Sequence, residues 1–278
     1  MKQKMSMGKR IGYLIFVVLF LLVMITPMLY MLSASFMTEK DLNQIPPKLL
    51  PSVPTLVNYA KAFTQQPLVK YVFNSFVITI IAVVICLVSG TMASYALTRT
   101  NIRFKTVFLL FVLAISLLPT ITLINPIYKM YSKLGLLNTH IGLAVIISVL
   151  DLPMTIWFLT AVMKGIPISF EESAKLDGAN LFQMFVYVLM PLLKASLFSI
   201  SILVFIGAWN RFLLSQVLNQ FEDYRTVVVG LTLYQTTHTI PFGVVAAAGM
   251  ITVLPLMIMV LFFQKNILGG IMEGGVKE

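Results

Sequence analysis

Long apolar stretches with few or no charged residues restrict most strongly how this chain can fold. A helix needs about 20 apolar residues to cross the hydrocarbon core of a bilayer. Five stretches reach that length: Ile11–Leu32, Tyr71–Thr98, Thr106–Tyr128, Leu134–Met163 and Val244–Phe263. Only the fourth contains an acidic residue, Asp151. Each of the five is therefore predicted to be a transmembrane helix.

The composition agrees with a chain that is surrounded mostly by lipid. Of 278 residues, 59% are hydrophobic and 11% are charged, whereas a soluble domain carries about 25% charged residues. This excludes a soluble enzyme. The net charge of +10 is typical of cytoplasmic loops rich in Lys and Arg, so nucleic-acid binding is not needed to explain it. The single cysteine, Cys86, excludes a disulfide framework and a CxxC metal site.

A sixth span is expected between Gly178 and Asn210, where Lys194 separates two uncharged runs. The second run, from Ala195 and extended past Arg211 to Leu214, has no internal proline and is predicted to be the span. The first is expected to lie at the membrane surface as an amphipathic segment. The predicted fold class is an all-α polytopic membrane protein with six transmembrane helices.

Basic residues predict the orientation. Twelve Lys and Arg residues fall on the side of the two termini and eight on the other, so both termini are expected in the cytoplasm. The N-terminus also resembles a signal peptide, but its apolar run exceeds the usual 7–15 residues, so a retained span is predicted. The expected layout is one permease domain, 1–278, with a core of about 70–265, cytoplasmic tails 1–10 and 265–278, an extracytoplasmic loop 33–70 and a cytoplasmic loop 164–194.

The two large loops differ in character. The outer loop contains five prolines, which favour an extended strap over a helix: Pro46, Pro47, Pro51, Pro54 and Pro67. The inner loop has helix signals. Ser169 and Glu172 have the spacing of a capping box, and Asp177-Gly178 predicts the end of a first helix. A second helix is expected over Ala179–Met190, ending at Pro191.

The inner loop contains more large apolar side chains than a loop exposed to solvent is expected to carry. Its large apolar side chains are Phe170, Leu176, Phe182 and Phe185. Acidic and small residues surround them, so the loop is predicted to contact another protein.

The segment ESAKLDGA at 172–179, followed by VLMP at 188–191, resembles the EAA loop of ABC importer permeases. That motif reads EAA, three residues, Gly, nine residues and I-x-L-P, and the spacing here has no gap. Ser173, Val188 and Met190 replace an alanine, an isoleucine and a leucine of the pattern.

Further segments narrow the resemblance to the carbohydrate importers of the maltose-permease type, and to the shorter of their two permease subunits. The resemblance extends over nearly the whole chain. The segments that carry it are ASYALTR at 93–99, LGLLNT at 134–139, GAWNRF at 207–212 and the closing GGVK at 274–277. The departures are Arg211, where the family more often has an acid, Ala195, where a proline is common, and Glu278, where glycine is usual.

The resemblance implies the partners and the site. The expected partners are a second homologous permease subunit, a dimer of cytoplasmic ATPases that bind ATP and Mg²⁺, and an extracytoplasmic sugar-binding protein. This chain itself has no P-loop and is expected to hold no cofactor or metal and to catalyse no reaction. The implied coupling residues are Glu171, Glu172, Ser173, Ala174, Asp177, Gly178 and Ala179, and Glu172 is expected to pair with a basic residue of the ATPase. The expected location is the bacterial or archaeal inner (plasma) membrane.

Asp151 is expected to face a cavity or a partner, because an unpaired charge is unfavourable in lipid. One interpretation places it on the translocation path, where it accepts hydrogen bonds from sugar hydroxyls. The other pairs it with a lysine or a backbone donor of the partner subunit. Asn125, Tyr128, Trp209 and Asn210 are further candidates for the path, although Trp and Tyr near span ends are often interfacial anchors.

Three other functions were compared with that of a sugar importer. A secondary transporter would be expected to show inverted repeats and several intramembrane charges, and a membrane-embedded enzyme would need clustered His, Asp or Glu residues. Neither explains the EAA spacing. An importer of the same type for a polyol, glycerol phosphate or a peptide-like solute stays open, because the binding protein largely selects the cargo.

Overall fold

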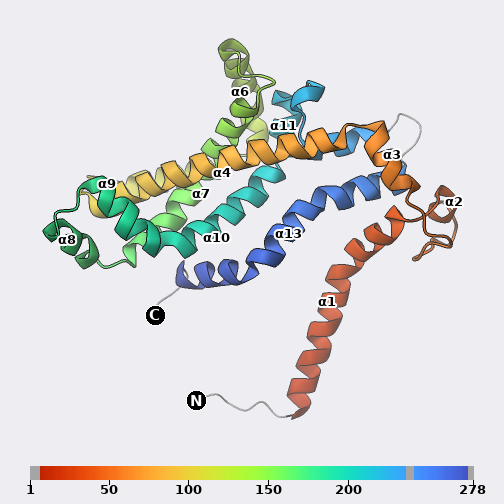
Figure 1. Ribbon diagram of the computed structural model, residues 1–278, viewed down its shortest axis with the longest axis horizontal. Helices are drawn as coiled ribbons and strands as arrows, with labels where there is room; N and C mark the ends of the chain where they lie inside the picture. Colours follow the sequence, from red (N-terminus) through yellow and green to blue (C-terminus); the bar gives the residue numbers. More distant parts are fainter. Residues whose placement is uncertain (1–6, 236–240, 275–278) are drawn as a thin grey trace. The chain divides into compact units, whose positions relative to one another are not determined.

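The computed structural model describes residues 7–235 and 241–274, with side chains in the last stretch given as far as Phe263. Every regular element in this part is helical (Figure 1). Lys2, Lys4, His238 and the closing residues 275–278 lie outside the described residues, and the side chain of Lys265 is not described.

The helices follow one another along the chain in the order α1 Met7–Ser35, α2 Glu39–Leu42, α3 Val57–Gln65, α4 Leu68–Arg99, α5 Lys105–Ser116, α6 Thr120–Leu134, α7 His140–Lys164, α8 Ser169–Leu176, α9 Leu181–Gln183, the π-helix η1 Met184–Leu189, α10 Met190–Trp209, α11 Phe212–Leu218, the 3₁₀-helix η2 Glu222–Tyr224, α12 Val227–Gly230, the 3₁₀-helix η3 Leu231–Tyr234 and α13 Phe242–Gly274.

Five helical segments of the described chain are long and apolar enough to cross a membrane. They are α1, α4, α7, the continuous segment Leu181–Trp209 and the Phe242–Phe263 part of α13. A sixth crossing results if the bent pair α5 and α6 forms one span. The predicted fold class, an all-α polytopic membrane protein, is confirmed.

The prediction of one continuous helix over Thr106–Tyr128 is wrong. The chain leaves the helix after Ser116, and α5 and α6 meet at an angle of 92°. Pro119 lies at the break with an extended backbone (ψ 122°). Proline lacks the N–H that would continue the helical ladder, and it disfavours helical dihedrals in the residue before it. A hydropathy count does not register this interruption.

The fourth span begins at His140, six residues later than predicted. Gly135 closes α6 in the left-handed region (φ 66°), so the chain turns before the next helix. The Thr139 hydroxyl then accepts a hydrogen bond from the Gly142 N–H at 3.0 Å and caps α7. From there α7 runs through both Asp151 and Pro153 without a break.

The predicted boundary at Pro191 is also wrong, because one helical rod runs from Leu181 to Trp209. The π-helix η1 directly precedes α10, and Pro191 is the second residue of α10. The change from the π-helical to the α-helical hydrogen-bond pattern accommodates a residue without an N–H inside the rod. The rod ends at Trp209, before the predicted Leu214. Arg211 has a non-helical backbone (ψ 72°), and the separate helix α11 follows it.

The chain divides into two compact units, and each is described by itself. The first contains Met1–Leu68 and Leu231–Leu254, and the second contains Val69–Gly230 and Pro255–Glu278.

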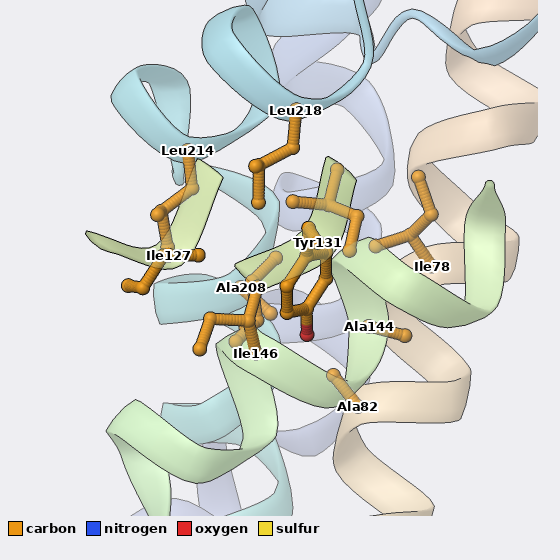
Figure 2. Packing of buried hydrophobic residues seen from close by; sticks show 11 residues of the cluster. Ile78, Ala82, Ile127, Tyr131, Ala144, Ile146, Ala208, Leu214 and Leu218 are labelled. Atoms are coloured by element: carbon orange, nitrogen blue, oxygen red, sulfur yellow. The ribbon is translucent and has the colours of Figure 1, made fainter. Parts of the chain in front are cut away.

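In the second unit, α4 packs closely against α7. A Cβ on Gly90 would lie 2.6 Å from Cγ2 of Thr155, so only glycine permits this approach. The Ser94 hydroxyl donates to the Ile156 carbonyl at 3.1 Å. Figure 2 shows a core cluster of this unit, where Tyr131 lies among aliphatic side chains from α4, α6, α7, α10 and α11.

In the first unit, the loop after α1 contains two short helices that the proline count did not predict, α2 and α3. The proline-rich segment between them is non-helical, as expected. Asp41 of α2 is buried and accepts hydrogen bonds from two residues of this segment, from the Ser52 hydroxyl at 2.7 Å and from Lys48 Nζ at 3.1 Å. These two donors, Ser52 first, hold the pKa of Asp41 well below its usual range. The carboxylate therefore fixes the segment at neutral pH.

Candidate functional site

The entry to α8 differs from the predicted capping box. Ile168 is the N-cap and already has helical dihedrals (φ −62°, ψ −26°), so Ser169 lies inside the helix and no side chain caps it. The Ile168 carbonyl accepts hydrogen bonds from the N–H groups of Glu171 and Glu172, at 2.8 and 3.1 Å. The predicted Ser169–Glu172 exchange is therefore wrong, because the chain turns into the helix directly after Pro167.

The end of α8 is as predicted. Gly178 has φ +83°, in the left-handed region that favours glycine. Its N–H donates to the Lys175 carbonyl at 3.1 Å, and the Ala179 N–H donates to the Ala174 carbonyl at 2.9 Å. This pair of bonds is the Schellman motif, and it turns the chain sharply from α8 towards α9.

A capping box does exist one turn later, at a place that the sequence reading missed. The Asn180 side chain accepts from the Gln183 N–H at 2.8 Å, and the Gln183 side chain accepts from the Asn180 N–H at 2.9 Å. The N-x-x-Q spacing is its sequence signal. The helix starts at Leu181, two residues later than predicted, and both ends of the turn between α8 and α9 are fixed.

The predicted coupling residues lie on two faces of this turn. Glu172, Ser173, Asp177 and Gly178 are exposed, Ala179 is half-buried, and Glu171 and Ala174 are buried. The seven residues therefore do not form one outward surface, since the buried face of α8 points into the protein.

Large apolar side chains surround the exposed carboxylates. Leu176 is 89% exposed, Phe182 75% and Tyr187 74% in the isolated chain, whereas Phe185, also predicted to be in this patch, is half-buried. The name coupling surface is used below for Glu172, Ser173, Leu176, Asp177, Leu181 and Phe182. A surface that combines this much apolar area with acids is typical of a protein-binding site.

Glu171 forms a buried ion pair with the last residue of α4. Arg99 Nε lies 2.5 Å from Glu171 Oε1, and Arg99 Nη2 donates to the Ile166 carbonyl at 2.8 Å. The Arg99 and Glu171 side chains are only 8% and 4% exposed. Glu171 was predicted to be a coupling residue, but its pairing with Arg99 was not predicted, because Arg99 is 72 residues away along the chain.

Asp151 pairs with Arg211 of the same chain. This partner within the chain was not predicted, and the interpretation that a donor of another subunit also meets Asp151 stays a prediction. A Cβ on Gly207 would lie 3.6 Å from Asp151 Oδ2, so α10 passes close to the carboxylate. Within the described residues, Asp151 Oδ2 and Arg211 Nε are buried without a hydrogen-bond partner. The pair can still offer one acceptor and one donor.

The other path candidates lie in different surroundings. Trp209 is buried and stacks on Phe205 with ring centroids 5.7 Å apart, and its Nε1 has no hydrogen-bond partner among the described residues. Asn210 is exposed, and its amide donates to the Ile206 carbonyl at 2.9 Å. Asn125 and Tyr128 are exposed on α6. The structure thus brings Asp151 towards the end of α10, but it does not gather all five candidates into one site.

The part of the chain with described side chains contains no group of three or more His, Cys, Asp or Glu residues that could hold a metal ion.

Comparison with known proteins covers most of the chain. Residues 86–271 match the family described as binding-protein-dependent transport system inner membrane component. The sulfoquinovosyl glycerol transport system permease protein SmoH of Agrobacterium fabrum is 33% identical over 90% of this chain and 88% of its own length. The trehalose/maltose transport system permease protein MalG of Thermococcus litoralis is 32% identical over 97% of both chains.

The fold is also known from an experimental structure. A chain in the crystal structure of a bacterial ABC transporter involved in the import of alginate matches with a TM-score of 0.81 and 24% identity, over 95% of this chain and 99% of that one.

Proposed function

Because the chain belongs to the family of inner-membrane components of binding-protein-dependent transport systems, we propose that it forms half of the translocation path of an ATP-driven sugar or oligosaccharide importer. As a family member it is a multi-pass, non-catalytic permease subunit of an ABC transporter. The proposed partners are a second permease subunit, a dimer of cytoplasmic ATPases that bind ATP and Mg²⁺, and an extracytoplasmic solute-binding protein.

The coupling surface is the observation that carries this proposal. It places two exposed carboxylates, Glu172 and Asp177, next to exposed Leu176 and Phe182 on a turn that is fixed at both ends. An ATPase cleft lined by apolar side chains and one or two basic residues would complement it in shape and charge. Glu172 in the first turn of α8 is the residue proposed to pair with such a base.

The role of this surface is mechanical. When two ATPase subunits close on ATP they move as rigid bodies, and a helix docked on one of them transfers that movement to the transmembrane helices. This requires a surface that holds its shape, which the Schellman motif at Gly178 and the capping box at Asn180 supply. Both termini and this loop are proposed to lie in the cytoplasm of a bacterial or archaeal cell.

Asp151 and Arg211 are proposed to contribute to the path for the cargo. Their Oδ2 and Nε atoms are buried without a partner among the described residues, and they would accept from and donate to sugar hydroxyls once helix movement opens the path to them. Asn125, Tyr128, Trp209 and Asn210 stay secondary candidates. A sugar is favoured over a polyol, glycerol phosphate or peptide-like cargo because the similar permeases SmoH and MalG are named for glycoside transport.

Affinity co-purification of the tagged chain tests the proposal. We expect a second permease and an ATPase to be recovered with the unmodified chain. Glu172→Lys and Gly178→Asp, which change the charge and the turn of the coupling surface, should each remove the ATPase. The matched control is Lys105→Glu, a charge reversal at an exposed residue outside the surface, which should retain it. A chain that purifies alone, or that keeps its ATPase with both changes, would reject this function.

A further inference from the structure

The end of α4 contacts α7, the turn before α8, α8 itself and η1. Arg99 bonds both to Glu171 at the start of α8 and to the Ile166 carbonyl in the turn before it. One guanidinium group therefore holds the turn and the helix together. Figure 1 shows α8 and α9 at the same end of α4.

Two neighbours of Arg99 extend this contact to the flanking helices. The Tyr95 hydroxyl lies 3.4 Å from Glu171 Oε2, and its ring packs edge-on against Phe185 of η1 with centroids 6.0 Å apart. The Thr98 hydroxyl lies 3.7 Å from the sulfur of Met163 in α7. One turn of α4 thus contacts α7, α8 and η1.

The Arg99–Glu171 pair differs from the other charges of this loop in being buried. Glu172, Lys175 and Asp177 are exposed, and water would screen any pairing between them. Separating Arg99 from Glu171 would instead leave two charges in an apolar environment, which is strongly unfavourable. The pair therefore resists relative movement of α4 and α8.

Resting on the function proposed above, we propose that Arg99 and Glu171 are positioning residues that make α8 and the adjoining end of α4 one rigid body. The division of roles follows from their places. Glu172 on the exposed face contacts the ATPase, while Glu171 on the buried face transfers the movement to α4. ATP-driven displacement of α8 then moves a transmembrane helix instead of deforming the loop.

A distance measurement in the assembled transporter tests rigidity directly. In a Cys86→Ala background, spin labels replace the exposed residues Thr100 and Lys175. We expect one narrow distance distribution that is the same without nucleotide and with trapped ATP. Glu171→Gln should broaden it or make it depend on nucleotide. A distance that changes between the two states without the substitution, or an unchanged distribution in Glu171→Gln, would overturn the inference.

The ratio of cargo transported to ATP hydrolysed supplies a second readout. Glu171→Gln and Arg99→Gln should lower this ratio about fivefold or more, the size of a typical coupling effect, while the ATPase still co-purifies. Arg99→Lys, which keeps the charge but cannot bond Glu171 and the Ile166 carbonyl through two nitrogens of one planar group, should recover only part of it. Lys164→Gln, at an exposed residue of the same region, is the matched control and should have no effect.

The outcomes separate this inference from the proposed function. No ATPase on the unmodified chain would reject the proposed function itself. Loss of the ATPase only in Glu171→Gln would make the pair part of docking and overturn the positioning role. A retained ATPase with an unchanged transport ratio would also overturn it.

Discussion

The ion pair between Asp151 and Arg211 joins a residue near the middle of α7 to the second residue after α10. Their side chains are 12% and 29% exposed, so neither charge is fully solvated by the surroundings. Such a pair is retained in a membrane protein only where each charge supports the other or a ligand. It holds the end of α10 against α7, next to Gly207.

Removing one partner should be worse than removing both. Arg211→Leu leaves the Asp151 carboxylate unpaired, and we expect it to destabilise the protein by about 3 kcal/mol, the lower end for breaking a buried pair. Arg211→Leu combined with Asp151→Leu should recover much of that loss, because no charge stays behind. Thermal unfolding of the purified transporter in detergent measures both. A double variant as unstable as the single one would show that the charge itself is not the cause.

At the scale of the helices, Pro119 and Pro191 have opposite effects on helix continuity. Pro119 ends one helix and begins another at 92°, whereas Pro191 lies inside a continuous rod after a π-helical turn. At Pro191 the helical hydrogen-bond pattern changes from π to α, which accommodates a residue without an N–H inside the rod. The local backbone, and not the residue type, decides between a break and a continuation.

The start of that rod can be tested at its cap. Asn180→Ala removes the side-chain acceptor for the Gln183 N–H and should cost about 1 kcal/mol. Amide hydrogen exchange over residues 181–189 should accelerate about fivefold, as this free-energy change implies. Asn180→Ser, which can still accept the hydrogen bond, is the control and should exchange nearly as slowly as the unmodified chain. Equal exchange in Asn180→Ala would show that packing alone fixes this end.

At the scale of the whole molecule, the long apolar helix α1 is the feature that points beyond this chain. In α1 the apolar side chains from Ile11 to Ile25 are more than a third exposed, apart from Val17, which is half-buried. Lipid and partner subunits are the surroundings that such a surface requires. We therefore expect lipid or partner subunits to cover α1, and the proposed assembly to supply the energy for transport.

The energy source distinguishes an ABC importer from a secondary transporter. In proteoliposomes with the full complex and its binding protein, uptake of a labelled di- or oligosaccharide should require ATP on the ATPase side. A proton or sodium ionophore should leave the rate unchanged, since no ion gradient drives the step. The control is a catalytically inactive ATPase, which should abolish uptake. Uptake without ATP that an ionophore collapses would favour a secondary transporter.

The spans and the family motif could be predicted from the sequence because each depends on neighbouring residues in the chain. Transfer of a helix into lipid depends on the summed hydrophobicity of about 20 consecutive residues, so the runs at Ile11–Leu32, Tyr71–Thr98 and Val244–Phe263 predicted spans 1, 2 and 6. The turn at Asp177-Gly178 is equally local, since only glycine readily takes the backbone conformation found there.

The pairings of charges could not be predicted in this way. Arg99 and Glu171 are 72 residues apart, and Asp151 and Arg211 are 60 apart. Which charge meets which depends on the helices that become neighbours and on the face of each helix that is buried. A single sequence contains the charged residues, but their separation in space follows only from packing, and so Glu171 faces Arg99 while the adjacent Glu172 is exposed.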